Sequence, residues 1–565
     1  MADKYKTLLI QWCDALLRSQ ITNEKDECFG GFSCESCGFP HGRADNAIYP
    51  FLCAYDITRD QKYIKGAEAL LHFRKRLLDD KGAVQNDFTS EWKGITAFSA
   101  IGLLKSLSYF ESIIPLSLKE QIEHCAIESA RWVHENMVIG FPAYVNYYCA
   151  AALVNALYGE RYGDKAYSKS AKQLLDYCLK LFTPNGLLAG EGKPHDDRSK
   201  KGCLPIDIGY MAEESMPCLI HAAAILHDDE SLCTLSGHAK KMLDFLLPDG
   251  GWDNSFGVRN NKWTYYGSRT SDGCIGAFTL LGKTDPLFAE AAERTFEILK
   301  KCTLNGLLHG GMQYEENAQP PCIHHTFCHA AALADAIHEG IKETTKHASL
   351  PCDAKGVWYK YYPELNTYKV RAGSYLATLT GYDYVMHTYR RGAAHASGGT
   401  LSLLYKDGTG AMIAGSVYDY QQTEPNNMQA PTDRVKHATL LPRAEYVKDG
   451  VKYATCLDLD AQITLRSEEN AITALVKAKL CSLQEQCQEE TPCVEFVYRF
   501  TPQGVTITAR GTNESVNLIL PVIKGSGELI TNNRFTKRSV FFLTGGFAAD
   551  EYTFPLSQEV TVTLK

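Results

Sequence analysis

Three stretches repeat one local phrase: LFTPNGLLAGEG at residues 181–192, LLPDGGWDNSFG at 246–257 and CTLNGLLHGGMQ at 302–313. Each follows a segment such as 167–182, where apolar residues recur at i, i+3, i+4 and i+7, the spacing of an amphipathic helix. Glycine-marked turns recur roughly 46 to 64 residues apart over the first 345 residues. A period of this size indicates stacked helical hairpins. Six hairpins closing on themselves would give an (α/α)6 toroid, and five hairpins is the alternative count.

From about residue 355 apolar and polar residues alternate instead, as in TLSLLYKDGTGAMIAG at 400–415 and VEFVYRFT at 494–501. A period of two between short turns is typical of antiparallel strands with one buried face. We therefore expect a multidomain α+β protein. An (α/α) toroid occupies residues 1–350, and an antiparallel β-sandwich of two large sheets occupies residues 355–565.

The composition excludes several classes of function. The chain has 565 residues, 45 % of them hydrophobic and 22 % charged, which is typical of a globular protein with two domains. A net charge of −8 argues against nucleic acid as a partner. No apolar run is long enough to span a membrane, and the N-terminus reads as an amphipathic helix rather than a signal peptide. We expect a cytoplasmic protein unless a leader has been trimmed, and a homo-oligomer is compatible with the sequence.

Twenty cysteines are scattered through the helical segments, as expected for reduced thiols in a cytosolic protein. Cys34 and Cys37 form a C-x-x-C next to Cys28, which is the start of a zinc motif. No second C-x-x-C or H-x-x-x-H lies nearby to complete four ligands. The sequence therefore favours neither a metal nor a cofactor.

The segment GGWDNSFGVRNNKWTYYGSRTSDGC at residues 250–274 combines cations and aromatic rings without an acid between Asp253 and Asp272. Aromatic faces can cover the C–H face of a sugar, and cations can pair with its carboxylate. A uronate-containing oligosaccharide or polysaccharide is thus the expected partner. The alternative is a solvated loop whose aromatic residues complete the core. The candidate substrate-binding residues here are Arg259, Lys262, Trp263, Tyr266 and Arg269.

Candidate catalytic acids lie in glycine-flanked loops. Asp207 and Asp272 form our first pair for glycoside hydrolysis, which requires two carboxyl groups beside the glycosidic oxygen. Glu191 and Glu213 are reserves, and Glu214 is expected only to stabilise the dipole at a helix start.

Other polar residues fall at predicted helix starts. Asn146 and Tyr147 open a helix, where Asn can bind a sugar or simply cap the helix. Arg43 either pairs with Asp45 or lines the same cleft.

Histidines form a further group of candidates. His325 and His329 have the i, i+4 spacing of a metal pair. Without a matching carboxylate, however, we expect His324 and His325 to form hydrogen bonds in the cleft. The segment 387–400 combines His, Arg and Gly in a way that is unusual for a strand interior. We expect it to reach the cleft and to place His395 there.

The order of toroid and sandwich resembles the heparinase II/III-like polysaccharide lyases. The phrase AHASGGT at 394–400 matches their Gly–His–x–Asp–x–Gly–Ser–Phe phrase in its His and a Gly but lacks the Asp. Their rim Asn–His corresponds to Asn146–Tyr147, and their catalytic Tyr corresponds to Tyr210. The resemblance implies β-elimination, in which a base removes the C5 proton while a donor neutralises the carboxylate. Asn146, Tyr147, Tyr210 and His395 would then carry the reaction.

Four phrases are closer to glycoside hydrolase family 154, enzymes of the β-glucuronidase type with the same build. They are HGRADNAIYPFLCAYDIT at 41–58, PIDIGYMAEES at 205–215, KWTYYGSRTSDGC at 262–274 and HHTFCHA at 324–330. This resemblance implies an exo-acting hydrolase that removes terminal glucuronate. Asp207 and Asp272, chosen as its acids on chemical grounds, both fall inside these phrases. A polysaccharide lyase is the alternative. A non-catalytic carbohydrate-binding protein, or an epimerase on the same scaffold, is a third class.

Overall fold

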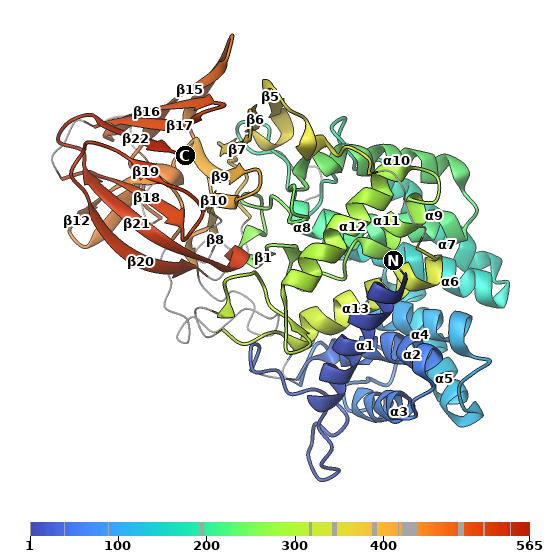
Figure 1. Cartoon of the computed structure of the whole chain (residues 1–565). Coiled ribbons are helices and arrows are strands. Elements are labelled where there is room, and N and C mark those ends of the chain that lie inside the picture. The colour runs from blue at the N-terminus through green and yellow to red at the C-terminus, as the bar shows by residue number, and fades with distance from the viewer. Residues whose placement is uncertain are drawn as a thin grey trace.

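The fold was analysed in a computed structural model of the chain. It describes residues 2–565 except 39, 89, 192–196, 270, 316–318, 342–346, 387–392, 416, 421–438, 484–486, 488–490, 512–514 and 543. Helices fill the first part of the chain and strands the second, and the change falls between α13, which ends at Glu339, and β5, which starts at Val357 (Figure 1). None of the described helices is long and apolar enough to cross a membrane.

Six inner helices form a closed ring, because each packs on the next and the last packs on the first. They are α2 (Ile48–Thr58), α4 (Thr96–Phe110), α6 (Val145–Tyr162), α9 (Met216–Ile225), α11 (Ile275–Leu281) and α13 (Ile323–Glu339). Their residues are apolar around most of the helix, and α6 buries thirteen of its eighteen positions. A helix that is apolar on all sides requires packing partners on all sides.

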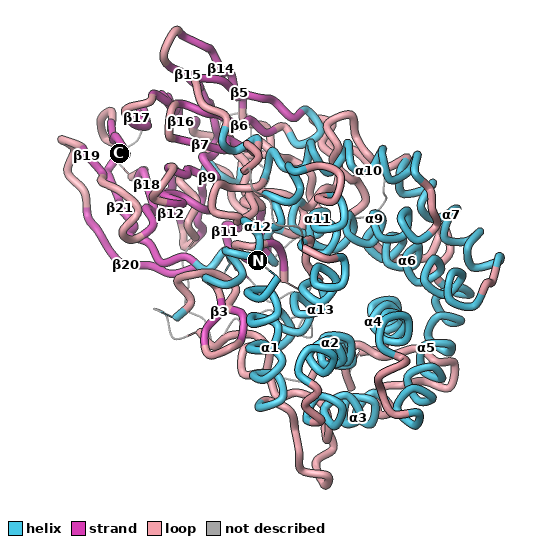
Figure 2. Tube along the Cα trace, turned by 45° about the vertical axis from the view of Figure 1, so that its right-hand side comes forward, coloured by secondary structure: helices cyan, strands magenta, loops and turns pink. Residues whose placement is uncertain are grey.

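An outer helix pairs with each inner helix to form six hairpins among the described residues (Figure 2). The outer helices are α3 (Lys62–Arg74), α5 (Leu116–Asn136), α7 (Lys165–Leu179), α10 (Asp229–Met242), α12 (Pro286–Lys301) and α1 (Ala2–Arg18). They are amphipathic, and α7 buries Tyr167, Ala171, Leu174, Leu175 and Cys178 along one face. The N-terminal α1 pairs with the C-terminal α13 and so completes the sixth hairpin.

The repeated glycines explain the repeated phrase. Gly250 has φ +91°, and a Cβ built on it would lie 2.1 Å from the carbonyl oxygen of Arg294 in α12. Gly186 lies in the same way against α10, and Gly306 lies against Gln11 and Ala15 of α1. Only glycine combines this backbone conformation with this close approach. Each such turn therefore rests on the outer helix of the next hairpin, and the turn at Gly306 closes the ring.

Three large antiparallel sheets make up most of the described C-terminal part, beside a two-stranded sheet of β8 (Ala393–His395) and β11 (Val417–Tyr420). The first has the order β10-β9-β7-β6-β5, with β5 (Val357–Tyr362), β6 (Thr367–Ala372), β7 (Tyr375–Thr380), β9 (Thr400–Lys406) and β10 (Gly410–Ala414). The second has the order β13-β12-β18-β21-β20, with β12 (Arg443–Lys448), β13 (Val451–Ala454), β18 (Asn517–Ile523), β20 (Thr536–Phe542) and β21 (Phe547–Pro555). The third has the order β14-β15-β16-β17-β22-β19, with β14 (Gln462–Glu468), β15 (Ala471–Lys479), β16 (Cys493–Thr501), β17 (Gly504–Arg510), β19 (Leu529–Ile530) and β22 (Val560–Leu564).

These sheets share one hydrophobic core. Strand β15 buries Ile472, Ala474, Val476 and Ala478 at every second position, as the alternating pattern predicts. The fold class predicted from the sequence, a helical toroid followed by an antiparallel sheet domain, is confirmed. The expectation of two large sheets was wrong, since the described strands form three large sheets and one two-stranded sheet.

The first sheet faces the toroid. Lys369 of β6 and Thr378 of β7 both bind the buried carboxylate of Asp253, at 2.8 and 2.5 Å. Ser402 of β9 hydrogen-bonds Ser255 at 2.9 Å. The toroid and the sandwich are therefore joined by buried polar contacts.

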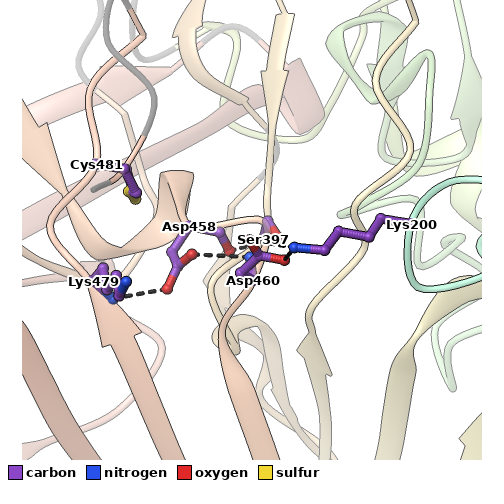
Figure 3. Close-up of a disulfide and its surroundings, with 7 residues drawn as sticks. Lys200, Ser397, Asp458, Asp460, Lys479 and Cys481 are labelled. Carbon is purple, nitrogen blue, oxygen red and sulfur yellow. Dashed lines mark hydrogen bonds and ion pairs between the residues drawn. A yellow bond between two sulfur atoms is a disulfide. The ribbon is translucent and has the colours of Figure 1, made fainter. Parts of the chain in front are cut away.

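Most cysteines are free thiols, and sixteen of the eighteen free cysteines are at least partly buried. Cys481 and Cys487 form a disulfide, which differs from the expectation of reduced thiols for that pair (Figure 3). Close to it, the Asp458 carboxylate accepts a hydrogen bond from the backbone N–H of Lys479 at 2.7 Å. Lys200 of the toroid reaches Asp460 at 2.9 Å in the same region (Figure 3).

Candidate active site

A polar pocket opens where the inner helices of the toroid begin. It is built from several segments, including the 3-10 helix η1 (Gly42–Ala47), the starts of α6 and α13, and the short helix α8 (Ile208–Tyr210). Its lining residues are Arg43, Asn86, Ile95, Phe98, Asn146, Tyr147, Tyr210, Glu214, Arg259, Lys262 and His324. Three of these are cations, so the pocket suits an anionic ligand although the whole chain is negative.

Tyr210 stands between two of these cations. Its hydroxyl oxygen accepts from a guanidinium nitrogen of Arg259 at 3.1 Å and from the Lys262 ammonium at 3.5 Å. The Arg259 guanidinium also lies over the Tyr210 ring, 3.8 Å from its centre. The hydroxyl itself donates to the carbonyl of Arg269 at 3.1 Å. Nearby positive charge favours the deprotonated form of a phenol, so this tyrosine is suited to exchange a proton with a ligand.

The Asp207 side chain fixes the position of Tyr210 through a hydrogen bond to its backbone. Its Oδ1 accepts from the backbone N–H of Tyr210 at 2.9 Å and so caps α8. Asn254 also contacts the carboxylate, at 3.3 and 3.4 Å. Asp207 is fully buried and does not line the pocket. It therefore acts on the pocket through the orientation of Tyr210.

Asn146 and Glu214 also line the pocket, and the Asn146 amide donates to Glu214. Glu214 lies on the π-helical turn η2 (Met211–Ser215), a rare local structure that is frequent at functional sites. Burial, with the negative charge of Asp272 as the next cause, raises the pKa of Glu214 to about 8, although Arg43 and Asn146 oppose the shift. The Glu214 carboxyl group is therefore largely protonated at neutral pH.

Glu191 is a second buried carboxyl group, beside the pocket. Its Oε2 lies 3.1 Å from the Arg259 guanidinium. Burial raises the pKa of Glu191 to about 7, Arg259 opposes the shift, and the charge of Asp207 adds to it. Glu191 thereby shares Arg259 with Tyr210.

Arg43 pairs with Asp272, and its guanidinium lies 4.1 Å from the centre of the Phe98 ring. The local alternative, an Arg43–Asp45 pair, is not formed, because Asp45 pairs with the buried Arg74 at 2.5 Å. Arg43 is thus turned into the pocket. Asp272 supports Arg43, whereas Asp207 contacts Tyr210 and Asn254.

The histidines separate into different roles. Both ring nitrogens of His324 are buried and make no hydrogen bond to the described residues, while His324 lines the pocket. His325 pairs with the Tyr266 hydroxyl at 2.8 Å, and His329 pairs with Glu213 at 2.8 Å. His325 and His329 therefore bind separate partners, and of these three histidines His324 lines the pocket.

Several predicted site residues lie in the core instead. Trp263 is fully buried, donates to the Trp252 carbonyl at 3.0 Å and contacts the Phe547 ring of the sandwich. The side chains of Tyr266, Arg269 and Glu213 are also buried and do not line the pocket. For these aromatic residues the alternative of completing the core describes the structure, because Trp263 packs on the sandwich and Tyr266 packs on His325 and His329 of α13.

His395 lies in β8 (Ala393–His395), which pairs with β11 (Val417–Tyr420). Its Nε2 is 3.0 Å from the carbonyl of Tyr382, and it does not line the pocket. Residues 387–392 of the segment expected to reach the cleft lie outside the described residues.

Of the predicted site residues, the pocket brings together Arg43, Asn146, Tyr147, Tyr210, Arg259, Lys262 and His324. Sequence reasoning missed Asn86 and Phe98, and it assigned Glu214 only to helix stabilisation. The two adjacent acids in MAEES at residues 211–215 were the sequence feature that could have indicated Glu214 as a pocket residue. The π-helical turn that directs it into the pocket was not visible in the sequence.

Solved structures with the same fold are polysaccharide lyases. Heparinase III matches with a TM-score of 0.55 and 11 % identity, over 99 % of this chain and 84 % of that one. The chondroitin AC lyase of Streptomyces coelicolor A3, in complex with chondroitin sulphate, matches with a TM-score of 0.55 and 11 % identity, over 100 % of this chain and 79 % of that one. At this identity the likeness shows the fold alone.

Sequence comparison defines the family. Residues 9–353 match the ulvan lyase N-terminal domain, and residues 359–540 match the ulvan lyase C-terminal domain. A broad-specificity ulvan lyase of Formosa agariphila is 33 % identical over 536 residues, which cover 93 % of this chain and 83 % of that protein. The protein is an enzyme, a polysaccharide lyase. The chain belongs to the ulvan lyase family.

This finding corrects the function predicted from sequence. Membership in glycoside hydrolase family 154 and removal of terminal glucuronate by hydrolysis were both wrong. The hydrolase interpretation relied on two carboxylates acting together, Asp207 and Asp272. In the structure one caps α8 and the other pairs with Arg43. The alternative of elimination agrees with the family.

Proposed function

We propose that the enzyme cleaves ulvan, a uronate-containing polysaccharide, by β-elimination in the pocket around Tyr210. The observation that carries this proposal is the contact of the Tyr210 hydroxyl with Arg259 and Lys262, in a pocket that the Asn146–Glu214 pair also lines. A lyase requires a base and a group that neutralises the carboxylate, and the pocket offers both.

The first requirement is to make the C5 proton acidic. The carboxylate next to C5 takes up negative charge when that proton leaves, so hydrogen-bond donors placed there stabilise the transition state. Asn146 offers an amide N–H, and protonated Glu214 offers an O–H. In a buried site these donors act more strongly than in water. We assign both to the substrate carboxylate.

The second requirement is a base that also serves as an acid. Tyr210, in its phenolate form, takes the C5 proton, and the C5–H electron pair forms the C4=C5 double bond. The bond between C4 and its glycosidic oxygen then breaks, and the leaving oxygen takes the proton back from Tyr210. The products are an unsaturated uronate and a chain with a free hydroxyl, and water is not consumed. Arg259 and Lys262 stabilise the phenolate that takes the C5 proton and that forms again when the leaving oxygen is protonated.

The remaining lining residues bind the polymer. Arg43 and Lys262 offer positive charge to an anionic glycan, and His324 offers two ring nitrogens for hydroxyl groups. Burial, with the positive charges of His41 and Arg43 as lesser causes, lowers the pKa of His324, so its ring is neutral and can both donate and accept.

The proposal is tested with ulvan by following the ultraviolet absorbance of the new C4=C5 bond together with reducing ends. We expect both signals to rise in parallel. Tyr210→Phe and Asn146→Ala should each lower kcat about 100- to 10,000-fold. The matched control is Tyr148→Phe, since the Tyr148 hydroxyl binds the Phe141 carbonyl at 2.7 Å and lies outside the pocket. Reducing ends without absorbance, or full activity in Tyr210→Phe, would contradict the proposal.

A further inference from the structure

Three cysteines converge next to the active site although they are far apart in sequence. Cys34 and Cys37 lie in the loop after α1, and Cys322 is the residue just before α13. Their sulfur atoms are 3.3 Å apart for Cys34–Cys37, 3.6 Å for Cys37–Cys322 and 3.9 Å for Cys34–Cys322. All three side chains are buried, and none is in a disulfide. The cluster thus brings three sulfur atoms within 3.9 Å of one another.

The spacing of the sulfurs is that of thiolates around a zinc ion. In a tetrahedral site with Zn–S bonds of about 2.3 Å, the sulfur atoms lie about 3.8 Å from one another. The C-x-x-C of Cys34 and Cys37 is also the usual spacing of two zinc ligands on one loop. Cys28 belongs to the same loop but is partly exposed and not in the cluster.

The start of α13 and a buried cation lie beside these sulfurs. Cys322 is the N-cap of α13, where the helix dipole stabilises an anion. The backbone N–H of Ile323 donates to Cys34, and that of His325 donates to Cys322. The buried guanidinium of Arg269 lies within electrostatic reach of Cys322 and Cys37. Three thiolates and a divalent ion carry one net negative charge, which Arg269 offsets.

We propose that Cys34, Cys37 and Cys322 bind one zinc ion that fastens the loop after α1 to the start of α13. Soft thiolate ligands select zinc over magnesium or calcium. The three thiolates supply three of the four ligands that zinc usually takes. The ion holds the first turn of α13, which carries the pocket residue His324.

The site is tested by metal analysis of the full chain, purified without chelators and without a metal-binding tag. We expect close to one zinc per chain in the wild type. Cys34→Ser, Cys37→Ser and Cys322→Ser should each lose most of it. Cys28→Ser is the matched control and should keep it. Replacement of zinc by Co²⁺ should give thiolate-to-metal charge-transfer and tetrahedral d–d absorption bands.

A strong chelator should lower the Tm of the wild type and of Cys28→Ser by several degrees, because zinc binding contributes to folding. The metal content and the cobalt spectrum of the wild type decide the question even where a serine variant fails to fold. A wild type without zinc that takes up no Co²⁺ would overturn the proposal. A Cys34–Cys37 disulfide in the purified chain, or full zinc content in Cys322→Ser, would overturn it too.

Discussion

At the scale of single residues, the protonation of Glu214 sets the chemistry of the pocket. A charged carboxylate at this place would repel the uronate that the pocket is proposed to bind. A neutral one donates a hydrogen bond to the uronate instead. Because burial, with the charge of Asp272 next, raises the pKa of Glu214 to about 8, the neutral form prevails at neutral pH. The same residue in an exposed loop would be ionised and would work against catalysis.

We expect kcat/KM on ulvan to fall above pH about 8, approaching tenfold per pH unit, as free Glu214 loses its proton. Glu214→Gln keeps a neutral donor and should retain activity further into the alkaline range. The measurement is the pH profile of initial rates for both proteins. If the activity of the wild type and of Glu214→Gln fell identically above pH about 8, that loss would have to come from the titration of another group.

The raised pKa of Glu214 should also make the free energy of unfolding depend on pH, in a direction that can be worked out. Between pH about 4.5 and about 8 the unfolded chain has released this proton while the folded chain keeps it. The free energy of unfolding therefore falls as pH rises across this window, by at most about 1.4 kcal/mol per pH unit from this residue. Glu214→Gln should flatten the dependence, as measured by denaturant unfolding at several pH values.

At the scale of elements, the helical hairpins depend on glycine turns that no other residue can make. Gly250 combines φ +91° with close approach to the Arg294 carbonyl in α12, whereas Gly163 has φ +66° and open space around it. Both glycines have a positive φ, but only Gly250 has backbone atoms close to the place where a Cβ would lie. Comparing substitutions at the two positions therefore distinguishes the cost of backbone strain from that of a steric clash.

We expect Gly250→Ala to destabilise the protein by roughly 3–5 kcal/mol, since strain adds to a clash with backbone. Gly163→Ala should cost only about 1 kcal/mol. Chemical denaturation of both variants checks this. Equal losses would mean that the contact with α12 relaxes and that only the backbone conformation matters.

At the scale of the whole molecule, the sandwich is joined to the toroid through the buried Asp253. The Asp253 carboxylate accepts hydrogen bonds from the side chains of Lys369, Thr378 and Ser255. All four side chains are buried. Asp253 belongs to the repeated turn phrase of the toroid, and Lys369 belongs to the first sheet. One residue thus serves both the hairpin turn and the domain contact.

Lys369→Met should destabilise the protein by about 3–5 kcal/mol, because it leaves a buried carboxylate without its cation. Lys200→Met is the comparison, since Lys200 and Asp460 form an exposed pair across the same two domains. It should leave the Tm unchanged. Thermal unfolding and limited proteolysis between the domains measure both effects. An unaltered Tm for Lys369→Met would show that the apolar contacts alone hold the domains.

The sequence by itself determined the architecture. Hydrophobic periods of 3.6 and of 2 are local properties, so hairpins and strands could be predicted, and the repeated glycine phrase predicted the closed toroid. It also supplied much of the pocket, because Asn146, Tyr210, Arg259 and His324 stand out as polar residues in loops and at helix starts. The order of these elements already resembled that of polysaccharide lyases.

Only the tertiary structure decided what those residues can do. Asp207 and Glu214 look alike in sequence, yet one caps a helix and the other faces the pocket with a raised pKa. Burial and contacts set protonation, and both depend on segments that are distant along the chain. The approach of Cys322 to Cys34 is of the same kind. Closing the ring brings α13 beside the loop after α1, and no pattern within either segment could reveal that.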